Sequence, residues 1–318
     1  MTAEPRFRRL ARFVSPADRG FAAVVYGGSI LFALLIVGLF ISLVVGSWPS
    51  IVAFGPSFIW KSAWDPSTSK FGALPMIYGT VVTSFIAIGL AAFVGIMAAV
   101  FLADFAPRWF AAPLSFLIEL LAAVPSVVYG LWGLFVLAPF VRTTIGPALQ
   151  HALGWMPIFS GQIYGVGLLT GALILALMIV PTVTAISRDV IAAIPGELRE
   201  ASASLGTTKW ETATRVVLPA AKVGIFGACV LGLGRALGET IAVTMVIGNR
   251  PEISSSLFAP SYTLASVIAN EFTEATTDMY LQALFEIGLV LFGITILANL
   301  LAQLLLRTFG SSATGAVQ

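Results

Sequence analysis

Long uncharged stretches alternate with short polar connections along this chain. A helix needs about 20 apolar residues to cross the hydrocarbon core of a bilayer, where its backbone polar groups must be paired within the helix. Six stretches meet this requirement, at residues 21–46, 76–103, 113–141, 163–187, 223–248 and 279–306. The pattern therefore predicts an all-α integral membrane protein with six transmembrane helices.

The composition agrees with a chain surrounded by a lipid bilayer. Of the 318 residues, 58% are hydrophobic and 10% are charged, whereas about 25% charged residues are usual in soluble proteins. The formal net charge of only +2 argues against a nucleic-acid partner. The single cysteine, Cys229, excludes a disulfide scaffold.

The distribution of lysine and arginine predicts the orientation in the membrane, because cytoplasmic loops carry an excess of these residues. Most of the 17 lie on one side, at Arg6, Arg8, Arg9, Arg12, Arg19, Arg108, Arg188, Arg199, Lys209, Arg215, Lys222 and Arg307. The other side has Lys61, Lys70, Arg142 and Arg250. We therefore expect both termini in the cytoplasm.

This topology divides the chain into a core and its flanking parts. The predicted parts are a cytoplasmic arm at 1–20, the first helix at 21–46, a periplasmic segment at 47–75, a permease core at 76–306 and a cytoplasmic tail at 307–318. The core includes a cytoplasmic loop at 188–222 and a second periplasmic segment at 249–278. Aromatic residues of the first periplasmic segment, such as Phe58 and Trp64, are expected to anchor at the membrane interface.

The cytoplasmic loop 188–222 carries the signals of two short helices. Pro195 suits the first turn of a helix, and Gly206 suits a left-handed C-terminal cap. Thr208 and Glu211 form a capping box that begins a second helix, which Pro219 is expected to close. The pair of helices is either a docking surface for another protein or an interfacial structure resting on headgroups.

A longer pattern in this loop resembles the EAA loop of ABC importer permeases. It consists of Glu200-Ala201-Ser202, then Gly206, then Val216-Val217-Leu218-Pro219, with the family's spacing at every position. Ser202 replaces an alanine of the motif, and Val216 replaces an isoleucine. The resemblance implies a type I ABC importer permease fold, in which these residues form a coupling helix seated in a groove of an ATPase subunit.

The chain has no phosphate-binding loop of its own. None of Lys61, Lys70, Lys209 and Lys222 ends a G-x-x-x-x-G-K-[ST] sequence. We therefore expect a transport subunit rather than an enzyme, with no cofactor, whose ATP is used by a separate ATPase. The only histidine, His151, lies away from any cysteine or carboxylate cluster, so no metal site is expected.

Charge inside the predicted spans is concentrated in the fifth, which contains Arg235 and Glu239 one helical turn apart. Such residues face a bundle interior or an aqueous path and have a partner, because charge is costly in lipid. They either neutralise each other or form an anion site. Gly234 and Gly238 form a G-x-x-x-G pattern, which favours close helix packing.

The anion hypothesis follows from the chemistry of the two side chains. A guanidinium donates two parallel hydrogen bonds to an oxyanion. A carboxylate beside it accepts the proton that inorganic phosphate retains at neutral pH, and it repels sulfate, which has none. Arg235, Glu239 and the adjacent Thr240 are therefore the predicted substrate pathway.

Three further stretches are similar to the PstC-type permeases of phosphate ABC importers. They are Leu233 to Asn249 (LGRALGETIAVTMVIGN), Pro125 to Gly133 (PSVVYGLWG) and Phe71 to Thr80 (FGALPMIYGT). The resemblance implies a bacterial inner-membrane subunit that works with a PstA-type second permease, a PstB-type ATPase dimer and a PstS-type periplasmic phosphate-binding protein. In that family an arginine and a glutamate of the first stretch are implicated in transport, which corresponds to Arg235 and Glu239.

Pro125 in the third span removes a backbone hydrogen bond and is expected to kink the helix. Ser126 or Tyr129 could line a cavity exposed by the kink, although a kink without substrate contact is the favoured interpretation. Glu119 is expected to pair with an arginine of another subunit.

Three other functions remain open. The first is a permease for another oxyanion, such as sulfate, molybdate or phosphonate. The second is an ion-coupled secondary carrier, for which Glu119, Glu239 and Glu286 would form a relay. The third, a membrane enzyme, is disfavoured because no catalytic constellation is present.

Overall fold

The computed structural model describes the backbone of residues 16–314 and the side chains of residues 20–306. The side chains of the predicted arm at 1–20, except Gly20, and of the predicted tail at 307–318, including their arginines, therefore lie outside the described residues. In the described part the chain is helical and forms no strand beyond the isolated bridges Asp65–Lys70 and Gly248–Ser261. This confirms the all-α fold class.

The longer helices are α1 (Pro16–Phe54), α3 (Leu74–Val100), α4 (Arg108–Ala123), α8 (Leu168–Ala192), α11 (Leu218–Gly238) and α14 (Asp278–Thr314). The shorter ones are α2 (Ser57–Trp60), α5 (Ser126–Trp132), α6 (Ala138–Phe140), α7 (Gly146–Leu153), α9 (Gly196–Ser204), α10 (Lys209–Thr212), α12 (Ile241–Val246) and α13 (Leu264–Glu271). Single π-helical turns extend several of them, at η3 (Phe101–Phe105), η4 (Gly133–Leu137), η5 (Val141–Ile145) and η7 (Ala213–Val217). Short 3₁₀ turns lie at η2 (Pro66–Thr68) and η6 (Pro157–Phe159).

Six helical runs in the described part are long and apolar enough to cross a membrane, which confirms the predicted number. They are Gly20–Phe54, Leu74–Phe105, Ser126–Leu153, Leu168–Ala192, Lys209–Gly238 and Asp278–Leu306. The bounds change most in two spans, the fifth, which was expected at 223–248, and the third, which was expected at 113–141. The chain breaks inside that range, and the apolar run begins only after the break.

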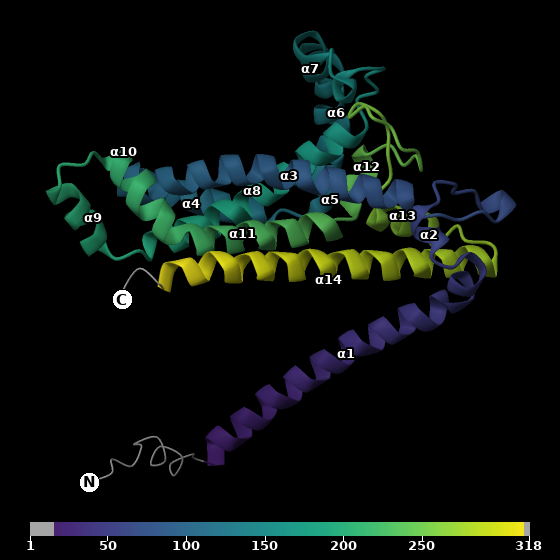
Figure 1. Ribbon diagram of the computed structural model, residues 1–318, viewed down its shortest axis with the longest axis horizontal. Helices are drawn as coiled ribbons and strands as arrows, with labels where there is room; N and C mark the ends of the chain where they lie inside the picture. Colours follow the sequence, from purple (N-terminus) through teal and green to yellow (C-terminus); the bar gives the residue numbers. More distant parts are fainter. Residues whose placement is uncertain (1–15, 315–318) are drawn as a thin grey trace.

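The centre of the bundle is the contact between α3 and α8, which run side by side with α11 along the long axis (Figure 1). Small residues recur every four positions on α3 and are buried, at Ala87, Ala91, Gly95 and Ala99. A Cβ built on Gly95 would lie 3.0 Å from Cγ1 of Val183 on α8. Small residues let the two backbones approach closely, which is how helices associate where no hydrophobic effect drives them together.

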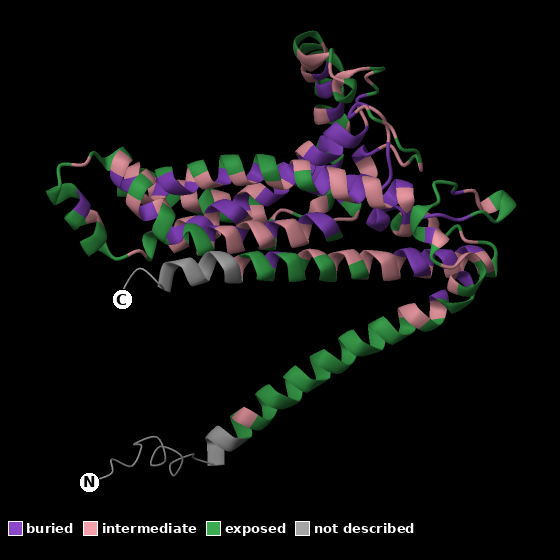
Figure 2. Cartoon of the chain, in the orientation of Figure 1, coloured by how far each residue is buried: buried purple, intermediate pink, exposed green. Residues whose placement is uncertain are grey.

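Helix α1 leaves the bundle and touches it mainly through α14 (Figure 1). Nearly every residue between 20 and 42 is exposed, as the green surface of α1 in Figure 2 shows. Near its C-terminal end, the Ser50 hydroxyl donates a 2.5 Å hydrogen bond to the buried carboxyl group of Glu286 on α14. The exposed apolar part of α1 is therefore available to acyl chains or to another subunit.

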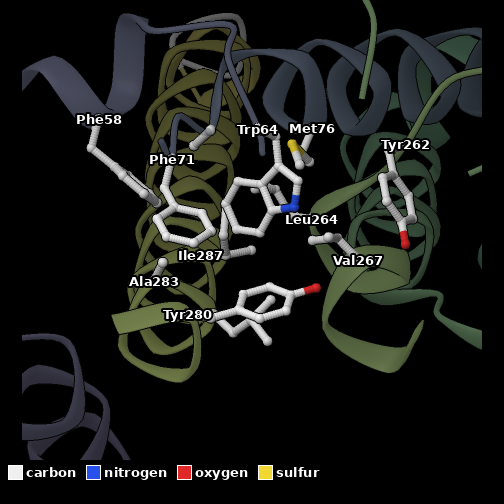
Figure 3. Packing of buried hydrophobic residues seen from close by; sticks show 12 residues of the cluster. Phe58, Trp64, Phe71, Met76, Tyr262, Leu264, Val267, Tyr280, Ala283 and Ile287 are labelled. Carbon is white, nitrogen blue, oxygen red and sulfur yellow. The ribbon is translucent and has the colours of Figure 1, made fainter. Parts of the chain in front are cut away.

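The end of the bundle opposite α9 and α10 is closed by a cluster of aromatic side chains (Figures 1 and 3). Phe58 and Trp64 are buried in it, so the prediction that they anchor at the membrane interface is wrong. The Trp64 indole and the Tyr280 hydroxyl both donate to one oxygen of Glu271, at 2.8 and 2.7 Å. Burial raises the pKa of Tyr262, which lies in the same cluster. The segments predicted to be periplasmic thus form a folded cap.

Candidate functional site

The fifth predicted span, 223–248, is interrupted at its most polar point. Helix α11 ends at Gly238, Glu239 has an extended backbone with ψ of 126°, and α12 begins at Ile241. A helix end leaves backbone N–H and C=O groups without intrahelical partners. Such groups are tolerated at membrane depth only where protein or a wet cavity covers them. The break therefore marks a polar site within the bundle.

The third predicted span, 113–141, has a similar break. Helix α4 ends at Ala123, the chain is extended through Val124 and Pro125, and α5 begins at Ser126. Pro125 therefore separates two helices, and the expectation of a kink within one helix is wrong. The Tyr129 hydroxyl spans the break and donates to the carbonyl of Leu121 at 2.8 Å.

The two breaks lie close together, because α5 packs against α12. A Cβ built on Gly130 would lie 3.1 Å from Cα of Ala242 and 2.5 Å from the sulfur of Met245. Only glycine permits this approach. This packing brings the unpaired backbone groups of two interrupted helices into one region. Neither of the two sequence stretches alone predicts that they meet.

Arg235 lies beside this region, on the last turn of α11, and is half-buried. Its Nη1 donates a long hydrogen bond of 3.5 Å to the Thr182 hydroxyl on α8. None of the ion pairs found between described side chains involves Arg235. A guanidinium without a carboxylate partner is costly in the membrane, so it favours an anion.

Glu239 does not neutralise Arg235. Among the described side chains no ion pair joins the two residues, although Glu239 directly follows the last turn of α11. Instead, Oε1 of Glu239 accepts a 3.3 Å hydrogen bond from the N–H of Ala242 and so caps α12. The Thr240 hydroxyl donates to the carbonyl of Gly238 at 3.2 Å. Glu239 and Thr240 are both half-buried.

The glycines on either side of Arg235 do not pack against another helix of the described chain. A Cβ built on Gly234 or on Gly238 would meet no atom within 4 Å outside the local helix backbone. The expected close packing through G-x-x-x-G is therefore absent here. This face of α11 is open for a substrate or for a second subunit.

Glu119 and Ser126 are less closely connected to the site. The exposed Glu119 on α4 lies 3.2 Å from Arg188 on α8. It thus has an ion-pair partner in its own chain, where we expected one in another subunit. Ser126 is half-buried at the start of α5. Of the three lining candidates, Tyr129 is the one whose side chain is buried.

The predicted coupling segment projects from the end of the bundle as α9 and α10 (Figure 1). The capping box is confirmed, because Thr208 accepts from the N–H of Glu211 while Glu211 accepts from that of Thr208. Gly206 has φ of +82°, as its predicted left-handed cap requires. Pro219 does not close a separate helix. It lies in the first turn of α11, and Lys209–Gly238 is one continuous helical run.

Ser202, the departure from the family motif, has a structural role. Its buried hydroxyl lies 2.7 Å from that of Thr207 and 3.1 Å from that of Thr212. The hydroxyls of Thr207 and Thr212 are 2.9 Å apart. The three hydroxyls tie α9 to the start of the run that becomes α11. An alanine at 202 would not form these bonds.

The outer surface of the coupling segment combines charge with exposed apolar side chains. Glu200 and Ala201 are exposed, as is Trp210. Leu205, at the tip between α9 and α10, is 85% exposed. Leu218 is half-buried and Pro219 is exposed where the run enters the bundle. A large apolar side chain at a protruding tip is typical of a protein contact.

The sequence does not identify Thr182, Arg199 or Leu205 as candidate functional residues. Thr182 is one of several threonines in an apolar helix, and Leu205 follows no pattern that distinguishes it from a core leucine. Arg199 is adjacent to the motif, but its partners come from other elements. The described residues contain no group of three His, Cys, Asp or Glu side chains placed to hold a metal ion.

Comparisons with known proteins agree with this geometry. Residues 91–311 match the family described as binding-protein-dependent transport system inner membrane component. The chain is 48% identical to a phosphate transport system permease protein of Mesorhizobium japonicum, covering 94% of this chain and 92% of that one. A protein of the same name from Haemophilus influenzae is 44% identical, covering 87% and 89%. A solved bacterial alginate ABC transporter has a similar fold, with a TM-score of 0.62 at 14% identity over 94% and 96% of the chains.

Proposed function

Because the chain belongs to the family of binding-protein-dependent transport system inner membrane components, we propose that it is the permease subunit of an ATP-driven inorganic phosphate importer. It forms half of the translocation pathway and couples to a separate ATPase. The extensive identity to phosphate transport permeases supports the substrate. The observation that carries the proposal within this chain is the half-buried Arg235 at the break between α11 and α12, which has no carboxylate partner among the described side chains.

Arg235, Glu239 and Thr240 provide the contacts that phosphate requires. The guanidinium donates to two phosphate oxygens, and its planar fork matches their geometry. One carboxylate oxygen of Glu239 accepts from α12. The other is then left to accept the proton of hydrogen phosphate and to repel sulfate. Tyr129, Ser126 and Glu119 are proposed as further lining residues, and Tyr129 is buried in a cluster with residues of α12.

The partners follow from the family and from the coupling segment. A second permease of the PstA type would cover the open face of α11. A dimer of PstB-type ATPases would bind α9 and α10, and a PstS-type phosphate-binding protein would dock on the periplasmic cap. ATP is used by the ATPase, and this chain carries neither a nucleotide site nor a cofactor. We also propose that both termini lie in the cytoplasm, because of the distribution of lysine and arginine.

Transport would proceed by alternating access. Closure of the ATPase dimer on ATP moves α9 and α10, and the permease pair changes from an inward-facing to an outward-facing state. Phosphate released by the binding protein enters beside Arg235, and ATP hydrolysis resets the inward-facing state. ATP hydrolysis supplies the free energy, and the ATPase dimer shifts the permease pair because its ATP-bound form binds one of the two permease states more tightly.

Competition uptake tests the substrate. The complete complex in proteoliposomes is supplied with internal ATP, external binding protein and labelled phosphate, and unlabelled phosphate, sulfate, molybdate or phosphonate is added. We expect unlabelled phosphate alone to reduce uptake of the label. If sulfate, molybdate or phosphonate competes as strongly as phosphate, the chain is a permease for another oxyanion or for oxyanions in general.

A further inference from the structure

One side chain connects the coupling helix α9 to two transmembrane helices. Arg199 on α9 forms an ion pair with Asp104 in η3, the last turn of the α3 helical run, with Nη2 and Oδ1 3.1 Å apart. Its Nη1 donates to the carbonyl of Ile194 at 2.6 Å, and its Nη2 to that of Ile191 at 2.9 Å. Ile191 lies in the last turn of α8, and Ile194 directly follows that helix.

These contacts are well suited to hold the three elements in a fixed arrangement. The last carbonyls of a helix have no intrahelical partner and carry a partial negative charge, so a cation beside them is favoured. The rigid fork of a guanidinium presents five N–H donors in fixed directions, whereas an ammonium has three donors on a single nitrogen. The side chains of Arg199 and Asp104 are only 27% and 13% exposed, so solvent screens this pair less than a surface ion pair.

The other connection of α9 leads elsewhere. The hydroxyl cluster of Ser202, Thr207 and Thr212 joins α9 to the helical run that continues into α11. Helix α11 carries Arg235, whereas α8 carries Thr182, to which Arg235 donates. When α9 moves, the hydroxyl cluster therefore transmits the displacement to α11 and Arg235, and Arg199 transmits it to α8 and Thr182. Without Arg199, α9 would remain attached to α11 but lose these bonds to α3 and α8.

We propose that Arg199 is a positioning residue for energy coupling, which makes α3 and α8 move with α9 when an ATPase displaces it. This inference rests on the proposed function and adds the connection between the ATPase contact and the helices around Arg235. Arg199 touches no substrate. Its loss uncouples ATP hydrolysis from transport while the outer docking surface of α9 stays intact.

The test measures phosphate import and ATP hydrolysis together in proteoliposomes that contain the complete complex and the binding protein. The variants are Arg199→Ala, Arg199→Lys and Asp104→Asn. The matched control is Arg215→Ala, which removes an arginine of the same segment whose side chain is 76% exposed and lies 3.9 Å from Glu211. We expect phosphate imported per ATP to fall about tenfold in Arg199→Ala, within the range typical of coupling between two sites. Arg199→Lys and Asp104→Asn should fall less, and Arg215→Ala should match wild type.

The second readout is the stimulation of ATP hydrolysis by phosphate-loaded binding protein. We expect Arg199→Ala to lose this stimulation together with most of the phosphate imported per ATP. If Arg199→Ala does not assemble, Arg199→Lys and Asp104→Asn decide the question, because each retains part of the contact. An unchanged ratio and unchanged stimulation in the assembled variants would overturn the proposal. A wild-type complex that hydrolyses ATP without importing phosphate would instead refute the proposed function, and the stimulation readout would still test Arg199.

Discussion

Leu205 provides a direct test of where an ATPase binds this chain. Its side chain is 85% exposed at the tip between α9 and α10. If a groove of the ATPase covers this tip, the leucine moves from water into an apolar environment. Substitution of Leu205 by alanine removes most of that contact and leaves the helix caps, Gly206 and the Ser202 hydroxyl cluster unchanged.

The expected magnitude follows from the exposed surface. Full burial of a leucine side chain contributes about 1.5–3 kcal/mol. With 85% of the surface available for burial, Leu205→Ala should weaken binding by roughly 2 kcal/mol, which is about a thirtyfold increase in Kd. Leu205→Met should keep most of the affinity, because methionine buries a similar apolar volume.

Titration of the purified permease pair with labelled ATPase in detergent gives the Kd. Leu39→Ala is the matched control, because Leu39 is also exposed but lies on α1, away from the coupling segment. It should bind the ATPase like wild type. A Kd for Leu205→Ala within about threefold of wild type, less than 1 kcal/mol, would show that the tip is not buried by the ATPase.

Three further substitutions test the site and the coupling segment. Arg235→Ala should reduce phosphate import by the assembled complex about a hundredfold, because hydrogen bonds to a charged group contribute ~3 kcal/mol when two are lost; unimpaired import would leave Arg235 with a structural role only. Glu239→Gln should narrow the preference for phosphate over sulfate by about tenfold in competition uptake, the effect of one charge-assisted hydrogen bond, and an unchanged preference would remove Glu239 from substrate selection. Ser202→Ala should lower the free energy of unfolding by about 1 kcal/mol, measured by denaturation of the purified chain, and an unchanged stability would argue against the hydroxyl cluster.

The sequence predicted those features that depend on local patterns. Six apolar runs, the Thr208–Glu211 capping box and the left-handed Gly206 all follow from short-range rules, and the structure confirms them. The coupling segment was placed correctly between α8 and α11 for the same reason. The prediction that its second helix ends at Pro219 is wrong, because a proline is also tolerated in the first turn of a helix that follows a π-helical segment.

Features that depend on contacts between distant segments could not be predicted. A continuous apolar pattern across 113–141 gave no sign that α4 ends before Pro125, since the extended residues there are as apolar as the helix. The i,i+4 spacing of Arg235 and Glu239 allowed an ion pair, but none joins them among the described side chains, and Glu239 instead accepts from the N–H of Ala242 on α12. The contact of Arg235 with Thr182 links residues from two separate spans.

Accumulation of labelled phosphate in proteoliposomes without any ion gradient tests the central claim most directly. The complete complex receives binding protein outside and either ATP or no nucleotide inside. We expect phosphate to accumulate above its external concentration only with ATP, and the accumulation to persist when an uncoupler is present. Accumulation that needs an imposed proton or sodium gradient, that an uncoupler abolishes and that does not need ATP would contradict the account and identify a secondary carrier.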